Sequence, residues 1–252
     1  MTSSTSVDVA GPSGAPAIVF VHGTRLTRAM WRAQVDGLAD RYRIVTLDLP
    51  GHGALADRSF TMTAATDEVA RVIESEIGAS AVVVGLSLGG YVAMDLAARR
   101  PELLRALVLS GATAEPVGPR ALPYRALAWA MERFDGPRLV ALNAWFFRTR
   151  FPAHIADPII DGGFWSGGGA TALRALTGER FAPRLATYDG PTLILNGELD
   201  PLFRLGVGGF ASAARDVRRV RLRGATHLAN LDRPAAFNAA VRRFVEDIAD
   251  RA

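Results

Sequence analysis

Residues 81–99 read AVVVGLSLGGYVAMDLAAR and carry the strongest indication of how this chain folds. The apolar run at 82–84 predicts a buried strand, and the segment 91–99 predicts a helix. Between them lies the pattern G-x-S-x-G, centred on Ser87. A sharp strand-to-helix turn holds its middle residue in a strained backbone conformation, so the flanking residues must be small and the hydroxyl stands free at the end of the sheet. The segment therefore predicts a strand, a tight turn and a helix, with a candidate nucleophile at the turn.

Short apolar runs of the same kind occur on both sides of this segment. Segments with helical periodicity separate them, and the clearest of these begins at Pro234 and repeats apolar residues from Phe237 to Ile248. This alternation is typical of an α/β fold whose mostly parallel, doubly wound sheet has helices on both faces. The strands that we expect lie at 17–21, 44–47, 81–84, 106–109, 192–195 and 217–222.

The alternation stops between residues 115 and 185. This part has helical patterns and no convincing strand, and it holds ten of the chain's twenty aromatic residues. We therefore expect residues 1–114 and 186–252 to form the α/β core, with 115–185 as a small helical insertion.

Composition excludes several kinds of chemistry. The chain of 252 residues has no cysteine, so thiol nucleophiles, disulfides and thiolate metal sites are ruled out. It also has no lysine, which leaves 29 arginines and removes Schiff-base chemistry, because arginine does not lose its proton. We expect neither a cofactor nor a metal.

Charge and hydropathy give little sign of a macromolecular partner. The net charge of +4 is modest, and the basic run at 218–223 alternates with apolar residues as an edge strand does. No stretch of 18 apolar residues and no signal peptide is visible. We therefore expect a cytoplasmic protein that binds a small molecule and neither nucleic acid nor membrane, while its oligomeric state is open.

A nucleophilic serine needs a base and an orienting carboxylate. Of the four histidines, His227 follows the last predicted strand, and Asp200 follows the strand before it. Since the carboxyl ends of parallel strands meet at one edge of a sheet, Ser87, Asp200 and His227 are expected on loops at that edge, in the chain order of such triads. Other carboxylates could still orient the base, namely Asp189, Asp216 or Glu115.

Acyl chemistry also needs donors for a developing oxyanion. The segment Val21-His22-Gly23-Thr24 follows the first buried strand, so the N–H of Thr24 could pair with that of Leu88 at the start of the helix after Ser87. His22 is expected to have a structural role in its loop, and His52 is expected either to have a structural role in its turn or to lie at the edge of the pocket.

Together these motifs resemble the α/β-hydrolase superfamily, and most of all its small esterases, enol-lactonases and C–C hydrolases. The resemblance implies Ser87 as nucleophile, His227 as general base and then acid, Asp200 as the orienting acid, and the Thr24 and Leu88 N–H groups as oxyanion donors. It also implies that 115–185 is a cap over the pocket. The residues that carry it are Val21 to Thr24 with Trp31, Asp48 to Gly53, Gly85 to Gly90, Gly197 to Asp200, and Gly224 to His227 followed by Asp232 to Pro234.

The aromatic content of the insertion suggests that part of it walls an apolar pocket. The candidate pocket residues are Trp129, Trp145, Phe146, His154 and Trp165. Arg148 and Arg150 could bind a substrate carboxylate, although the simpler interpretation is that both lie on a solvated helix face.

Three functions remain, and the first is preferred. The leading one is hydrolysis of a small to medium, largely apolar ester or lactone through an acyl-enzyme on Ser87. The second uses the same three residues for C–C bond hydrolysis, or for proton abstraction and elimination. The third is a ligand-binding protein without catalysis.

One departure from the resemblance is the short N-terminus, which leaves room for at most a stub of a leading strand at 7–9.

Overall fold

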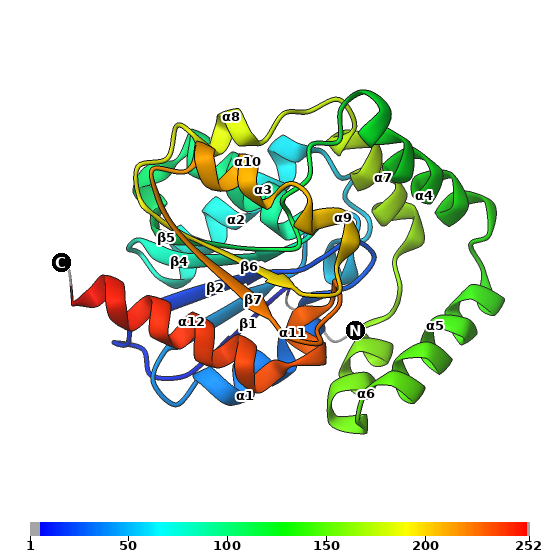
Figure 1. Cartoon of the computed structure of the whole chain (residues 1–252). Coiled ribbons are helices and arrows are strands. Elements are labelled where there is room, and N and C mark those ends of the chain that lie inside the picture. Colours follow the sequence, from blue (N-terminus) through cyan, green and yellow to red (C-terminus); the bar gives the residue numbers. More distant parts are fainter. Residues whose placement is uncertain (1–5, 251–252) are drawn as a thin grey trace.

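The computed structural model describes residues 6–250 of the chain. Seven strands form one sheet in the order β1-β3-β2-β4-β5-β6-β7, in which β1 pairs antiparallel with β3 and the other neighbours are parallel. All six expected strands are present, so the predicted fold class is confirmed (Figure 1). The strands are β1 Val7–Ala10, β2 Ala17–Val21, β3 Arg43–Leu47, β4 Ala81–Leu86, β5 Leu104–Ser110, β6 Pro191–Gly197 and β7 Asp216–Leu222.

The two edge strands match what the sequence predicts for them. The leading strand β1 is a stub of four residues whose register places Val7 opposite Leu47. At the other edge, β7 exposes Arg219 and Arg221 while Leu222 is buried. Charged side chains on an edge strand discourage pairing with another chain.

Helices cover both faces of the sheet because the buried strands are apolar on both sides. Along β2, Val19 and Val21 belong to the core under α2 and α3, while Ile18 and Phe20 belong to the core under α1 and α12. The first face carries α2 (Met62–Glu76), α3 (Leu88–Arg99), α8 (Ala182–Leu185) and α10 (Val207–Ala213), and the second carries α1 (Arg32–Leu38), α11 (Ala229–Asp232) and α12 (Pro234–Ala249).

Short helical turns complete the loops between these elements. Three of them, η1 (Arg28–Trp31), η2 (Gly53–Leu55) and η3 (Pro101–Leu103), are 3-10 turns, and α9 (Pro201–Arg204) is a single α-helical turn after β6.

Residues 115–185 contain helices and, over that whole described range, no strand. They include the turn η4 (Gly118–Ala121), α4 (Leu122–Arg133), α5 (Pro137–Arg150), α6 (Ala153–Gly162) and α7 (Ser166–Leu176), followed by α8. Helix α4 packs on α7 and α5 packs on α6, so the insertion forms two helix pairs to one side of the sheet (Figure 1).

Candidate active site

Ser87 occupies a strained turn between β4 and α3. Its φ of +53° lies in the left-handed region that L residues seldom adopt. Its N–H donates to Ser110 O at 2.8 Å, which ties the turn to the end of β5. The neighbouring glycines are required by close backbone packing, since a Cβ would stand 2.3 Å from Gly89 O at Gly85 and 2.1 Å from Val21 O at Gly89.

His227 and Asp200 are hydrogen-bonded, with 2.8 Å between Nδ1 and Oδ2. His227 lies in the loop after β7, and Asp200 is the buried N-cap of α9, where its Oδ1 accepts from Phe203 N–H at 3.3 Å. The Phe203 ring stacks on the imidazole with 4.8 Å between centroids. Gly111 leaves room for the imidazole, because a Cβ there would stand 2.7 Å from His227 Cε1.

The other candidate carboxylates serve different partners or lie elsewhere. Glu115 accepts hydrogen bonds from the Phe181 and Ala182 N–H groups. Asp189 pairs with Arg215 at 2.5 Å, and Asp216 begins β7, at the amino end of that strand. Asp200 is thus the carboxylate that the fold brings to His227.

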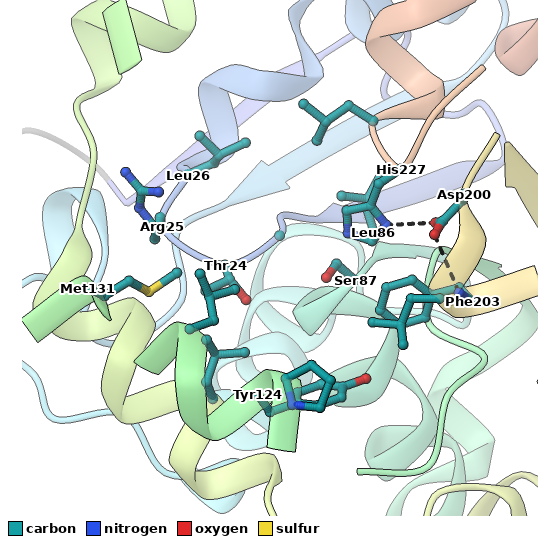
Figure 2. A pocket seen from close by; sticks show the side chains of 16 residues that line it. Thr24, Arg25, Leu26, Leu86, Ser87, Tyr124, Met131, Asp200, Phe203 and His227 are labelled. Atoms are coloured by element: carbon teal, nitrogen blue, oxygen red, sulfur yellow. Dashed lines mark hydrogen bonds and ion pairs between the residues drawn. The ribbon is translucent and has the colours of Figure 1, made fainter. Parts of the chain in front are cut away.

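Ser87, Asp200 and His227 line one cavity of about 400 Å³ (Figure 2). Within residues 6–250 no hydrogen bond joins the Ser87 hydroxyl directly to His227. Contacts of this kind commonly tighten only when substrate is bound. The remaining lining residues are Gly23, Thr24, Arg25, Leu26, Leu86, Pro123, Tyr124, Leu127, Met131, Leu173, Leu202, Phe203 and Leu228.

Two backbone N–H groups near Ser87 have no acceptor among the described residues. They belong to Thr24, in the loop after β2, and to Leu88, the first residue of α3. Thr24 lines the cavity, and Leu88 stands at the positive end of a 12-residue helix. This arrangement can stabilise a negatively charged oxygen beside Ser87.

His22 and His52 hold these loops together as neutral rings. His22 Nδ1 donates to Gly23 O and its Nε2 accepts from Leu49 N–H, both at 2.9 Å. His52 Nδ1 donates to Pro50 O at 3.0 Å and its Nε2 accepts from Arg25 N–H at 3.3 Å. Burial lowers the pKa of His22 to about 4 and that of His52 to about 3. Both rings therefore hold their loops in place, and His52 is not among the residues that line the cavity.

The structure does not place the five expected cap residues on the cavity. Trp129, Trp145 and Phe146 are not among the residues that line it, and their side chains are 58%, 62% and 41% exposed. His154 lines a separate hollow beside Arg150, and Trp165 Nε1 donates to Gly162 O at 3.0 Å. The lining of this cavity thus differs from the residues expected, because aromatic content does not tell which face of a helix turns toward the sheet.

The insertion contributes other residues to the cavity, from α4 and α7. Pro123, Tyr124, Leu127 and Met131 share one face of α4, and Leu173 comes from α7. The helical spacing of the α4 residues was the available signal. Burial raises the pKa of Tyr124 to about 12, and its hydroxyl lies 2.8 Å from that of Tyr91.

The two arginines of α5 that were considered for substrate binding lie outside the cavity. Arg148 is exposed, and Arg150 pairs with Asp232 at 2.6 Å. Arg25, which directly follows Thr24, lines the cavity instead, and no pattern in the sequence singles it out.

Residues 6–250 contain no group of three or more histidine, aspartate or glutamate side chains placed to hold a metal ion. In the same range no helix combines the length and the apolar character needed to span a lipid bilayer.

Comparison with known proteins identifies the family of the chain. The sequence profile of the Alpha/beta hydrolase family matches residues 18–240. A 3-oxoadipate enol-lactonase from Acinetobacter baylyi is 28% identical over 250 residues, which is 96% of this chain and 93% of the lactonase. A pimeloyl-(acyl-carrier protein) methyl ester esterase from Neisseria meningitidis serogroup B is 29% identical over 257 residues, which is 93% of this chain and 95% of the esterase.

The chain therefore belongs to the alpha/beta hydrolase family. The crystal structure of an enol-lactonase from Burkholderia xenovorans superposes with a TM-score of 0.77 at 24% identity, over 95% of both chains. At this identity the superposition establishes the fold alone.

Proposed function

We propose that this protein is a serine hydrolase that cleaves small to medium, largely apolar carboxylic esters or lactones. In this proposal Ser87 is the nucleophile, His227 is the general base and then acid, and Asp200 holds His227 in position. The observation that carries the proposal is the pair of Asp200 and His227, joined at 2.8 Å, on the wall of the cavity that Ser87 also lines. The lactonase and the esterase among its relatives support the same class of reaction.

The proposed reaction has two halves. His227 Nε2 accepts the Ser87 proton while Oγ attacks the substrate carbonyl carbon, and Asp200 accepts the Nδ1–H bond that fixes the tautomer. The N–H groups of Thr24 and Leu88 stabilise the oxyanion of the tetrahedral intermediate. The C–O bond then breaks, and the alcohol leaves with the proton from His227. A water molecule, deprotonated by His227, attacks the acyl-enzyme, and the acid departs as Ser87 regains its proton.

The walls of the cavity indicate which acyl groups fit. Leu26, Leu86, Leu127, Leu173 and Phe203 present apolar surface around the serine. A volume of about 400 Å³ lies at the small end of the range for ligand sites. We propose that residues 115–185 act as a cap, because α4 and α7 supply part of this apolar wall.

The decisive experiment compares Ser87→Ala with Ser59→Ala, a surface serine, on a panel of p-nitrophenyl esters and lactones. We expect Ser87→Ala to lose activity by about 10³-fold or more, since it removes the covalent step, and Ser59→Ala to match the wild type. A fluorophosphonate probe should label the wild type and the Ser59 variant at Ser87, and leave Ser87→Ala unlabelled. Activity that survives in Ser87→Ala within tenfold of the wild type would contradict the proposal.

Product analysis in ¹⁸O-water tests whether the reaction is a hydrolysis. Hydrolysis through an acyl-enzyme places one labelled oxygen in the product acid, because water attacks the acyl carbon. Elimination places none there, so an unlabelled product would exclude the hydrolytic mechanism.

A further inference from the structure

Arg25 is held rigidly in the loop that carries one of the proposed oxyanion donors. Its φ is +68°, which is unfavourable for a residue with a side chain. Its N–H donates to His52 Nε2 at 3.3 Å, and its carbonyl accepts from Trp165 N–H at 2.9 Å. The backbone of Arg25 is thus fixed between the α/β core and the start of α7, in spite of its strain.

The side chain of Arg25 is half-buried, and two of its guanidinium nitrogens have no partner among the described residues. Its Nε and Nη2 atoms are buried, and neither has a hydrogen-bond acceptor among residues 6–250. Burial lowers the pKa of Arg25 below its usual value. A buried cation without an ion pair costs free energy, and such groups are usually paired.

No acidic side chain of the described residues forms an ion pair with Arg25. Asp135, at the turn between α4 and α5, is the acidic group that partly offsets this pKa shift, but no ion pair joins it to Arg25 among residues 6–250, and its carboxylate accepts from Gly136 N–H at 3.0 Å. The other acidic and basic side chains that line the cavity are Asp200 and His227, and these two are hydrogen-bonded to each other. Arg25 is therefore the charged residue of the cavity wall that still needs an anion.

Helix α7 leaves space for this side chain. A Cβ at Gly169 would stand 2.7 Å from Arg25 Cγ, so the arginine occupies room that exists only because residue 169 is glycine. Figure 2 shows Arg25 at one end of the pocket, His227 and Asp200 at the other, and Ser87 between them.

We propose that Arg25 selects esters or lactones that carry a carboxylate at the end of the molecule remote from the reacting carbonyl. This inference rests on the proposed hydrolysis at Ser87. With the carbonyl at Ser87, the apolar walls take the intervening carbon chain, and the carboxylate supplies the counter-charge that Arg25 lacks. The substrate class is thus narrower than apolar esters in general: an apolar chain with an anionic end.

The test uses pairs of substrates that differ only in this charge. Each pair is the p-nitrophenyl monoester of a linear dicarboxylic acid and the same molecule with its free carboxylate capped as a methyl ester, over a series of chain lengths. The proteins are the wild type, Arg25→Gln, Arg25→Lys and Arg148→Gln, the last being a matched loss of one exposed arginine outside the cavity.

We expect the wild type to prefer the free carboxylate at one or two chain lengths. Arg25→Gln should lower kcat/KM for those substrates by about tenfold to a hundredfold, the usual range for a hydrogen bond to a charged group, mainly through KM. Its kcat/KM for the methyl-capped substrates should stay within about threefold of the wild type. Arg25→Lys should keep part of the preference, and Arg148→Gln should keep all of it.

A binding measurement separates this inference from the proposed function. In Ser87→Ala, calorimetry should detect binding of the free dicarboxylic acid of preferred length, and the double variant with Arg25→Gln should lose it. If hydrolysis depends on Ser87 but no charge preference exists, this inference fails and the proposed function stands. If Ser87→Ala remains active but Arg25 still governs dicarboxylate binding, the proposed function fails and the anion site stands. Equal losses on charged and capped substrates in Arg25→Gln would make Arg25 structural and overturn the inference.

Discussion

The loops at the carboxyl edge of the sheet and the helices of residues 115–185 line the same cavity, but they are held in different ways. The loops are fixed by buried polar side chains that bond to backbone. Asp48 accepts from Arg28 and Ala54 N–H groups at 2.9 Å each, and Asn196 Oδ1 accepts from Gly111 N–H at 2.9 Å. The bonds from Arg28 to Asp48 and from Gly111 to Asn196 join segments that are separate in the chain, and the bond from Ala54 closes a single loop, so the loops around Ser87, Asp200 and His227 are held in place.

The helical insertion has few such contacts. Helix α5 packs on α6 and leaves Val140, Leu142 and Trp145 exposed, and α4 leaves Leu122 and Trp129 exposed. In the proposed mechanism the reacting side chains therefore lie on the well-bonded loops of the core, whereas the shape of the pocket also depends on the helices of residues 115–185. Three predictions test this contrast.

The largest difference should appear between two matched glycine substitutions, one in each region. Gly89→Ala places a Cβ 2.1 Å from Val21 O, so the backbone beside Ser87 must shift. We expect a loss of about 3 kcal/mol or more in the free energy of unfolding, which lowers Tm by about 6–12 °C. Gly167→Ala, in α7, meets nothing within 4 Å and should leave Tm unchanged or raise it slightly. Thermal unfolding measures both, and similar Tm losses in the two variants would remove the contrast.

A smaller effect concerns pH, because the buried rings of His22 and His52 belong to the rigid region. Burial lowers their pKa values from 6.5 to about 4 and about 3, so the unfolded chain binds protons that the folded protein excludes. The free energy of unfolding therefore has its full value above pH 6.5 as far as these two rings are concerned. It falls as the pH drops toward 4, by about 1.4 kcal/mol per pH unit for each ring.

Denaturant unfolding between pH 7 and pH 4 measures this slope. In His52→Gln the amide can still donate and accept hydrogen bonds, and the slope of unfolding free energy against pH should decrease by about the contribution of one histidine. His154→Gln changes an exposed histidine of the insertion and should leave the slope as in the wild type. An unaltered slope in His52→Gln would show that the ring does not titrate as its burial implies.

The smallest effects should come from two side chains of the insertion. Trp145 is exposed on α5, so Trp145→Ala should change the free energy of unfolding by less than about 0.5 kcal/mol and leave ester hydrolysis unaltered. Met131 is buried on the cavity wall, so Met131→Ala should raise KM several-fold while kcat is retained. Steady-state kinetics separates the two, and a strong effect of Trp145→Ala would mean that α5 closes over the pocket during turnover.

Much of the core could be predicted from local patterns. A strand that is buried on both faces is continuously apolar, which is why β2, β4 and β6 could be located from residues alone. The turn at Ser87 was equally readable, because close backbone packing leaves glycine as the residue that fits at positions 85 and 89.

The carboxylate partner of His227 could be ranked from the chain order but not chosen with certainty. Asp200, Asp189, Asp216 and Glu115 all stand near strands, and the folded chain alone brings Asp200 to 2.8 Å from the ring. Hydrogen bonds between distant loops depend on how the strands pair, and strand pairing is a long-range property.

Local sequence thus established the strands, the serine turn and the edge at which the site lies, because neighbouring residues and backbone sterics control those features. The folded arrangement of the helices established which side chains meet the cavity. It placed Tyr124, Leu127 and Met131 on the cavity wall and left Trp129 and Trp145 away from it, and it buried two guanidinium nitrogens of Arg25 without a partner among the described residues. The physical reason is that a helix carries apolar residues on more than one face here, so its orientation is set by contacts with α7 and the core, which are far away in the sequence.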